Sequence, residues 1–109
     1  MSEPTDEALM LRARECDVGA FADLAARHQP WVERFLYHML WDREAAEDGA
    51  QEVLVNVWLA RNRYEPAARF TTFLFACARN WLRNAVDRRA RRPPVVPLQD
   101  QLGPTAREA

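Results

Sequence analysis

The sequence predicts an all-α fold, a compact bundle of about four helices with a proline-rich C-terminal tail. Apolar residues recur at helical spacing through most of the chain, and Val55 and Val57 are the only hint of a strand. The chain has 109 residues, of which 49% are hydrophobic and 28% charged. These are the size and proportions of one globular domain, and they exclude a disordered chain, a collagen-like repeat and a disulfide scaffold.

The first elements follow from capping residues and apolar spacing. Thr5 or Asp6 is expected to cap a first helix, and Gly19 allows a break or a close approach. Residues 28–30 (His-Gln-Pro) predict a boundary, with Pro30 in the first turn of the next helix. That helix has an apolar stripe with i, i+4, i+8 spacing. The stripe consists of Trp31, Val32, Phe35, Leu36, Met39 and Leu40.

Asp42 is expected to cap the next helix, which reaches residue 58. Gly49 inside it disfavours helix by about 1 kcal/mol relative to Ala, and either close packing or tolerated strain could account for this glycine. Residues 61–69 contain Asn, Tyr and Pro and predict a loop.

A final helix is predicted from Phe70 to about Arg91, capped by Thr71 or Thr72. Its core stripe is predicted to be Phe70, Phe73, Leu74, Cys77, Trp81 and Val86. The opposite, exposed face is predicted to be Thr72, Ala76, Arg79, Asn80, Arg83 and Asp87.

The prolines set the domain boundaries. Pro93, Pro94 and Pro97 exclude helix and are followed by Gly103-Pro104. We expect residues 1–5 to be disordered, residues 6–92 to form the helical domain, and residues 93–109 to be a linker or tail.

The charges are divided along the chain. Residues 1–60 carry 5 Arg and 12 Asp or Glu, a net charge of −7, whereas residues 61–92 carry 9 Arg and 2 acids, a net charge of +7. A basic block of this size is a candidate phosphate-binding surface. Complementing a helix dipole would explain only one or two of these arginines.

The sequence offers no chemistry of an enzyme. It has no glycine-rich phosphate loop, His-Glu-x-x-His or Cys-x-x-Cys motif, and His28 and His38 are too scattered for a metal site. Reduced, buried thiols are favoured over a disulfide for Cys16 and Cys77. With no secretory signal or apolar span in the sequence, we expect a cytoplasmic protein without membrane insertion.

One helix face combines acids with an amide. Asp48, Gln51 and Glu52 lie at i, i+3 and i+4, and Leu54 and Trp58 are expected to flank them. Such a face suits a partner with arginines, and a merely solvated acidic face is the alternative.

The loop mixes aromatic and basic groups, as proteins that hold unstacked bases do. For Tyr64 this role and a place on the core are equally favoured, whereas Phe70 is expected in the core.

Three segments together resemble region 2 of a bacterial sigma factor, of the extracytoplasmic-function (ECF) type of the sigma-70 family. They are residues 17–24 (DVGAFADL), residues 46–58 with Ala-Glu-Asp, Gln-Glu-Val and Val-Trp, and residues 69–80 with Arg-Phe-Thr-Thr-Phe-Leu and Ala-Arg-Asn. The resemblance covers about residues 6–92.

The resemblance implies a transcription initiation factor domain without cofactor or metal. In the family, the acidic-amide helix docks on the clamp helices of the RNA polymerase β′ subunit, which implies this role for Asp48, Gln51, Glu52, Leu54 and Trp58. An anti-sigma protein commonly covers such surfaces.

The loop and last helix of the family recognise the promoter −10 element, on its non-template strand, and hold it melted. This implies capture of a flipped base by residues 62–69 and DNA contact by the last helix. The DNA-binding residues implied are Asn62, Arg63, Tyr64, Arg69, Thr72, Arg79, Asn80 and Arg83.

Four positions depart from the family pattern. Phe73 stands where Trp is usual, Ala76 where a basic residue is frequent, Cys77 where a β-branched residue is, and Gly49 where a larger apolar residue is. The family also has a second helical domain, region 4, and we expect the natural chain to continue into it; a naturally short factor is the alternative.

Two other functions fit the composition. One is a helical protein-interaction module whose basic segment is incidental. The other is a stand-alone duplex-binding repressor, which is disfavoured because its two-helix reader needs a turn of about 3–4 residues, and the predicted loop is longer.

Overall fold

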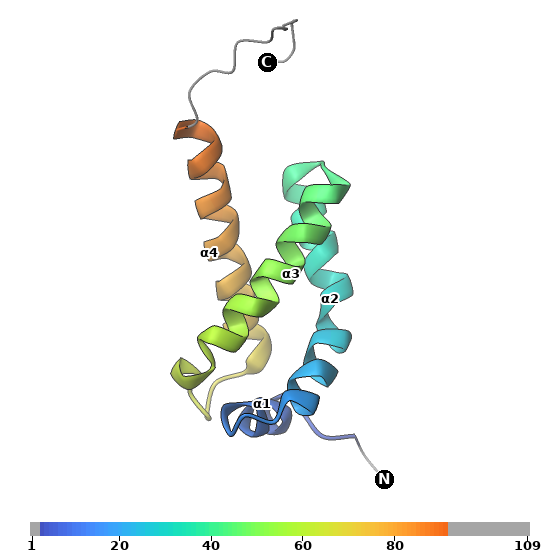
Figure 1. Cartoon of the computed structure of the whole chain (residues 1–109), viewed down its shortest axis with the longest axis vertical. Coiled ribbons are helices and arrows are strands. Elements are labelled where there is room, and N and C mark those ends of the chain that lie inside the picture. Colours follow the sequence, from blue (N-terminus) through green and yellow to red (C-terminus); the bar gives the residue numbers. More distant parts are fainter. Residues whose placement is uncertain (1–2, 92–109) are drawn as a thin grey trace, which may run out of the picture.

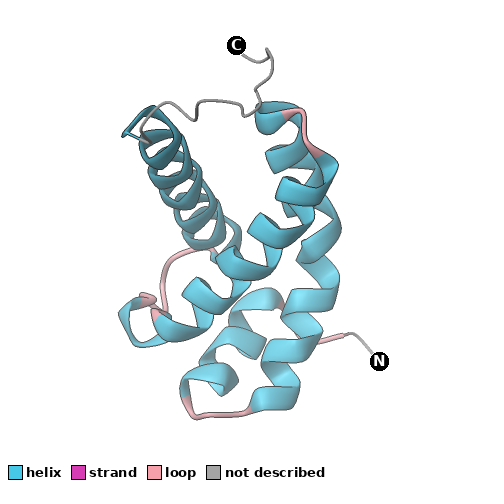
Figure 2. Ribbon diagram, turned by 45° about the horizontal axis from the view of Figure 1, so that its top comes forward, coloured by secondary structure: helices cyan, strands magenta, loops and turns pink. Residues whose placement is uncertain are grey.

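The protein consists of helices joined by short connections. The computed structural model describes residues 3–91, with only the backbone at residue 91. It contains α1 (Asp6–Arg14), α2 (Val18–Leu40), α3 (Arg43–Leu59), the short 3₁₀ helix η1 (Arg61–Arg63) and α4 (Phe70–Arg91), and residues 3–91 include no strand (Figures 1 and 2). The predicted all-α bundle is confirmed, whereas the predictions for residues 1–2 and 93–109 lie outside the described residues.

The helices form an open bundle. α3 crosses from the upper end of α2 to the lower end of α4, and α1 lies across the lower end of the bundle (Figure 1). Most contacts of α2 are with α1 and α3, and α4 packs chiefly on α3. The α4 helix therefore has much of its surface free for other contacts.

Capping side chains fix where three helices begin. The Thr5 hydroxyl accepts a hydrogen bond from the Ala8 amide at 3.0 Å, and the Asp42 carboxylate accepts one from Ala45 at 3.1 Å. The predicted Asp42 cap is confirmed, and of the two candidates predicted for the first helix, Thr5 is the cap and Asp6 is the first residue of α1. Asp17, which was not predicted to be a cap, accepts from Ala20 at 3.0 Å and begins α2.

The predicted helix boundary at residues 28–30 is wrong, because α2 runs through Pro30 without a break. Pro30 lies on the exposed side of α2. On the other side the buried positions Leu24, His28, Val32 and Leu36 continue at four-residue spacing past the proline. Burial of this stripe outweighs the hydrogen bond that a proline removes from a helix.

The predicted caps of the last helix are also wrong. Thr71 and Thr72 lie within the first turn of α4, and both are exposed. Instead, the Glu7 carboxylate of α1 accepts a hydrogen bond from the Phe70 amide at 2.8 Å. A carboxylate at a helix N-terminus satisfies a free amide and complements the helix dipole. Glu7 thus ties the first helix to the last.

We expect Glu7→Ala to lower the free energy of unfolding by about 1–2 kcal/mol, because it removes a charge-assisted hydrogen bond from a helix N-terminus. Urea denaturation measures the change. Glu7→Gln keeps an oxygen acceptor and should lose clearly less. Glu3→Ala, which removes a surface ion pair with Arg27, should change stability by less than about 0.5 kcal/mol. Equal losses from Glu7→Ala and Glu3→Ala would contradict the capping role.

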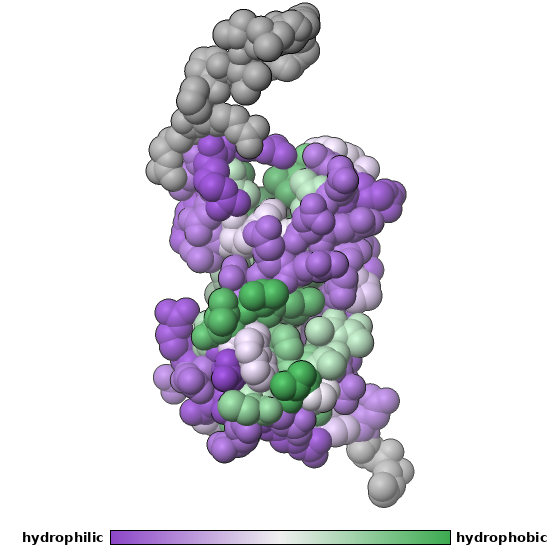
Figure 3. Space-filling view, viewed as in Figure 1, coloured by the Kyte–Doolittle hydropathy of each residue, from purple (hydrophilic) through white to green (hydrophobic). Residues whose placement is uncertain are grey.

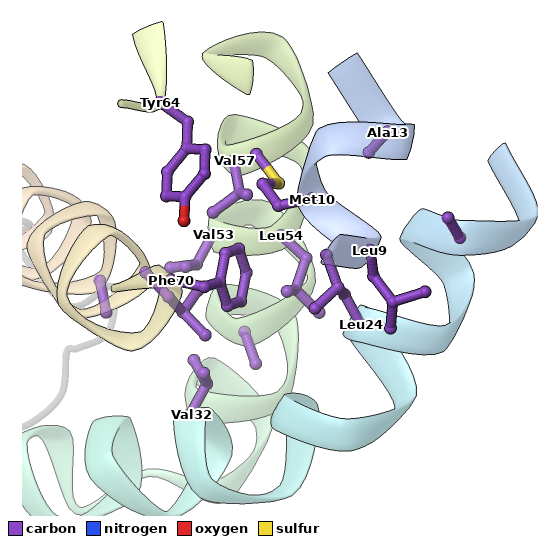
Figure 4. Close-up of a cluster of buried hydrophobic side chains, with 14 of the residues drawn as sticks. Leu9, Met10, Ala13, Leu24, Val32, Val53, Leu54, Val57, Tyr64 and Phe70 are labelled. Atoms are coloured by element: carbon purple, nitrogen blue, oxygen red, sulfur yellow. The ribbon is translucent and has the colours of Figure 1, made fainter. Parts of the chain in front are cut away.

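A contiguous apolar core holds the bundle together (Figure 4). Its largest fully buried side chains are Tyr64, Phe70, Leu9, Met10, Leu24, Leu36, Leu74, Val32, Val53 and Val57. His28 is the buried polar residue of this region. Its Nδ1 accepts from the Trp31 indole at 2.7 Å and its Nε2 lies 2.9 Å from the Asp6 carboxylate. Both ring nitrogens are satisfied, so His28 has a core role.

Both cysteines are free, but they differ in exposure. Cys77 is half-buried, and burial raises the pKa of its thiol. The expectation that Cys16 is buried is wrong, because this residue lies exposed in the turn between α1 and α2. Its φ of 70° turns the chain sharply from one helix into the next.

Candidate interaction surfaces

The acidic and amide side chains predicted on one helix face lie together on the outer side of α3. Asp48, Gln51 and Glu52 are all exposed, as the predicted shared face requires. They line a hollow of about 360 Å³ with Val55 and Asn56. The three groups can therefore contact one partner surface at the same time.

Leu54 does not belong to this surface. It is 7% exposed and packs in the core among α1, α2 and α3 (Figure 4). Trp58 is half-buried. The centroids of the Trp58 and Phe21 rings are 5.3 Å apart, and the Arg61 guanidinium lies 3.9 Å from the centroid of the Trp58 ring. The expectation that Leu54 flanks the acidic face is wrong, and Trp58 offers a partner only part of its ring.

Two other apolar residues continue the exposed face of α3. Val55 is 55% exposed and Leu59 is 70% exposed. They lie seven and eleven residues after Asp48, which returns them to nearly the same side of the helix. Figure 3 shows hydrophobic atoms gathered in a band across the face where α3 lies, below a hydrophilic upper part. We call Asp48, Gln51, Glu52, Val55 and Leu59 the α3 face.

Trp81 of α4 contacts α3 at both Glu52 and Gly49. The Trp81 indole donates a hydrogen bond to the Glu52 carboxylate at 2.8 Å. Its ring fills the space beside Gly49, where an added Cβ would lie 2.5 Å from Cη2 of the ring. Gly49 therefore serves close packing, one of the two explanations that the sequence left open.

The second surface is the exposed side of α4. The six residues predicted on this side are all exposed: Thr72, Ala76, Arg79, Asn80, Arg83 and Asp87. The Arg83 guanidinium donates to the side-chain oxygen of Asn80 at 2.8 Å, which orients the amide. Guanidinium and amide groups together can contact phosphates and base edges. We call this side of the helix the α4 face.

The loop before α4 contributes fewer accessible groups than predicted. Tyr64 is 2% exposed, with its ring packed against Phe70 and Phe73. Its hydroxyl donates to the Ala68 carbonyl, and burial, followed by the charges of nearby carboxylates, raises the pKa of the phenol. The place of Tyr64 on the core, one of the two predicted roles, is therefore confirmed, and base stacking by this ring is excluded. The exposed polar side chains of the segment are those of Asn62, Arg63, Glu65 and Arg69.

Residues 3–91 contain no group of three or more His, Cys, Asp or Glu side chains that could hold a metal ion. Within the same residues, no helix is both long and apolar enough to cross a membrane. The described surface carries acids and exposed aliphatic groups on α3 and arginines on α4.

The structure is that of a small helical domain with acidic groups exposed on α3 and arginines exposed on α4. Residues 24–92 match the family Sigma-70 region 2. The chain belongs to this family, whose members are transcription initiation factors and not enzymes.

Sigma factors are among its relatives. The chain is 42% identical over 77 residues to the RNA polymerase sigma factor CarQ of Myxococcus xanthus, covering 71% of this chain and 44% of that protein. It is 34% identical over 82 residues to the ECF RNA polymerase sigma factor RpoE of Cereibacter sphaeroides, covering 72% of this chain and 45% of that one. The chain spans less than half the length of these relatives.

The fold also matches a solved structure. This is the NMR structure of an engineered region 2 of sigmaE in complex with GTAAAA. The TM-score is 0.79 at 27% identity, covering 87% of this chain and all of the other. The likeness confirms the predicted helical fold.

Proposed function

We propose that this domain docks on core RNA polymerase and recognises and melts the promoter −10 element. The observation that carries the proposal is the division of charge between two helices of a sigma-70 region 2 fold. The α3 face combines two carboxylates with an amide, and the α4 face combines arginines with an asparagine. The related domain in complex with GTAAAA supports DNA binding by a domain of this fold.

The α3 face is the proposed docking surface for the β′ clamp helices. Asp48 and Glu52 suit arginines of the partner, and Gln51 supplies a neutral hydrogen-bonding group between them. Val55 and Leu59 extend the contact with apolar surface, replacing Leu54 in this role. Because Trp81 holds Glu52 by a hydrogen bond, one carboxylate is already oriented before docking.

The proposed DNA surface runs from the loop along the exposed side of α4. Exposed groups of the loop, with Arg69 just before the helix, supply the lower part, and Arg79, Asn80 and Arg83 supply the upper part. Arginines bind phosphates of any sequence, whereas Asn80 has the groups to read a base edge. The acidic first half of the chain opposes binding of duplex DNA by the free domain.

Binding assays with and without core RNA polymerase test this function. We expect the fluorescently labelled chain to bind core polymerase, and the complex to bind single-stranded DNA carrying a −10 element in preference to duplex DNA. The affinity for DNA should fall as salt rises. Tight, salt-insensitive duplex binding by the free chain would refute the proposal. Failure to bind polymerase would favour a protein-interaction module without promoter recognition.

Two substitutions on the α4 face should separate base reading from phosphate binding. We expect Asn80→Ala to change the sequence preference for single-stranded DNA, because a base-edge contact is worth about 1–3 kcal/mol. Arg79→Ala, which leaves the Arg83–Asn80 hydrogen bond in place, should weaken binding to all sequences about equally and reduce the salt dependence. Competition binding with a panel of −10 variants measures both. Identical profiles for the two variants would remove the base-reading role from Asn80.

Regulation by an anti-sigma factor in the cytoplasm is part of the same proposal. A protein that covers the α3 face and the α4 face together would block both polymerase docking and DNA binding. Its surface would need basic groups opposite Asp48 and Glu52 and acidic groups opposite Arg79 and Arg83. Competition between such a protein and core polymerase for the labelled chain is the direct measurement.

A further inference from the structure

The sequence suggested Tyr64 as an aromatic residue that could stack on a base, but a different aromatic residue is exposed in the structure. Tyr64 and Phe70 are buried, and Phe73 and Trp81 are half-buried against Tyr64 and Gly49. Phe75, which the sequence did not single out, is 38% exposed. It has the largest exposed fraction of the aromatic residues of α4.

Phe75 lies in a groove between α2 and α4. The groove has a volume of about 480 Å³, and Phe35, Met39, Leu82 and Val86 form its apolar lining with Phe75. The rings of Phe35 and Phe75 meet edge to face with centroids 5.2 Å apart. Their packing holds Phe75 in place, so a planar ligand would meet an ordered ring.

Charged groups border this apolar surface. Arg79 and Arg83 line the groove and also belong to the α4 face. The Arg79 guanidinium lies 5.8 Å from the centroid of the Phe75 ring. Asp87 lines the groove as well and offers an acceptor for an amino group. The groove therefore presents cations, a ring face and an acceptor to the same ligand.

We infer that this groove binds an unstacked base of single-stranded DNA, with the base on Phe75 and the adjoining phosphates on Arg79 and Arg83. The inference rests on the proposed function and adds to it a base pocket separate from the loop of residues 62–69. Proteins that hold single strands combine a basic groove with aromatic platforms, and arginine beside the ring strengthens stacking. A peptide would fit the aliphatic lining, but it would also need acidic side chains placed opposite both guanidiniums.

Photocrosslinking tests where the base lies. The probe is a single strand of about 12 nucleotides, within the usual site size of such proteins, with 5-iodouracil at one position in turn. The full chain is irradiated with each probe, and the crosslinked residue is located by mass spectrometry. We expect a crosslink to Phe75 or Met39 from one probe position. Crosslinks confined to other segments would overturn the inference.

Affinity measurements separate stacking from packing. Phe75→Leu keeps an apolar group on Phe35 but removes the ring face, so binding of the single strand should weaken about 5- to 100-fold. Phe75→Tyr keeps the ring and should restore binding. The matched control is Trp41→Leu, which removes an exposed ring at the turn between α2 and α3 and should leave affinity unchanged.

The outcomes distinguish the pocket from the function on which it rests. If Arg83→Ala weakens binding and Phe75→Leu does not, the α4 face binds DNA and the base pocket is refuted. If the chain binds no single strand, even with core polymerase present, the proposed function fails and the pocket with it. Equal salt dependence of the wild-type chain and Phe75→Leu is expected, because no phosphate contact is removed. Thermal melting of each variant confirms that it is folded.

Discussion

Removing the polar groups of the α3 face should weaken binding to core RNA polymerase by more than about 100-fold, because each group at the centre of an interface is worth roughly 1–2 kcal/mol. The informative variant combines Asp48→Ala, Gln51→Ala and Glu52→Gln. Glutamine at position 52 removes the charge but keeps an oxygen that can accept the hydrogen bond from Trp81. Anisotropy of the labelled chain with core polymerase measures the loss.

A matched control removes the same number of charges elsewhere. Glu15→Gln with Asp23→Asn takes two exposed carboxylates from the turn after α1 and from α2, outside the α3 face. We expect this control to bind polymerase within about two-fold of the wild-type chain, with only the long-range attraction reduced. If both variants lose binding equally, overall charge and not the α3 face determines docking.

The apolar end of the same face can be measured separately. Val55→Ser with Leu59→Ser should weaken polymerase binding by about ten-fold or more, because two exposed aliphatic groups would no longer be buried in the contact. Since both side chains are exposed in the free domain, the free energy of unfolding should change little. The result expected from the sequence alone, in which Leu54 carries this contact, is excluded by the burial of that residue.

Features of the fold that depend on neighbours along the chain were predictable. Thr5 and Asp42 cap their helices through amides three residues away, and this relation is visible in the sequence. The cap of α4 was not predictable in this way. Glu7 lies 63 residues from the Phe70 amide that it accepts from, and no local pattern relates two such positions.

The α3 face was predictable in part for the same reason. Asp48, Gln51 and Glu52 share a side because their spacing matches the helical period. With about 100° per residue, position 54 falls about 120° from Asp48, whereas positions 55 and 59 fall within about 20°. The helical spacing alone therefore predicts Leu54 away from the α3 face, and Val55 and Leu59 on it, as the structure shows.

The burial of Tyr64 in the loop and the exposure of Phe75 in the groove could be learned only from the structure. A segment without periodicity does not reveal which of its side chains points inward, so the burial of Tyr64 could not be decided from the sequence. Phe75 is one of several aromatic residues in α4, and its exposure depends on how closely α2 approaches. At Pro30 the local sequence predicts a helix boundary. The helix nevertheless continues, because burial of the apolar side of α2 stabilises it by more than the proline costs.

The close packing of α3 on α4 gives the second large effect, which is on stability. We expect Gly49→Ala to lower the free energy of unfolding by up to about 2 kcal/mol. Alanine gains about 1 kcal/mol of helix propensity over glycine, but its Cβ would lie 2.5 Å from the Trp81 ring. Forcing an extra methyl group into a packed contact costs about 1–3 kcal/mol. Urea denaturation followed by circular dichroism measures the balance.

Gly19→Ala is the matched control, because an added Cβ there meets only the Asp17 carboxylate oxygen at 3.5 Å, an ordinary contact. That variant should gain about 0.5 kcal/mol from the smaller entropy of its unfolded state. A double-mutant cycle then assigns the Gly49→Ala loss to its cause. In a Trp81→Leu background the loss should vanish, and an undiminished loss would place the strain elsewhere. Trp81 also donates a hydrogen bond to Glu52, so a shift of its ring would change the position of that carboxylate. Gly49→Ala should therefore weaken polymerase docking as well, because the packing of α3 on α4 positions a residue of the α3 face.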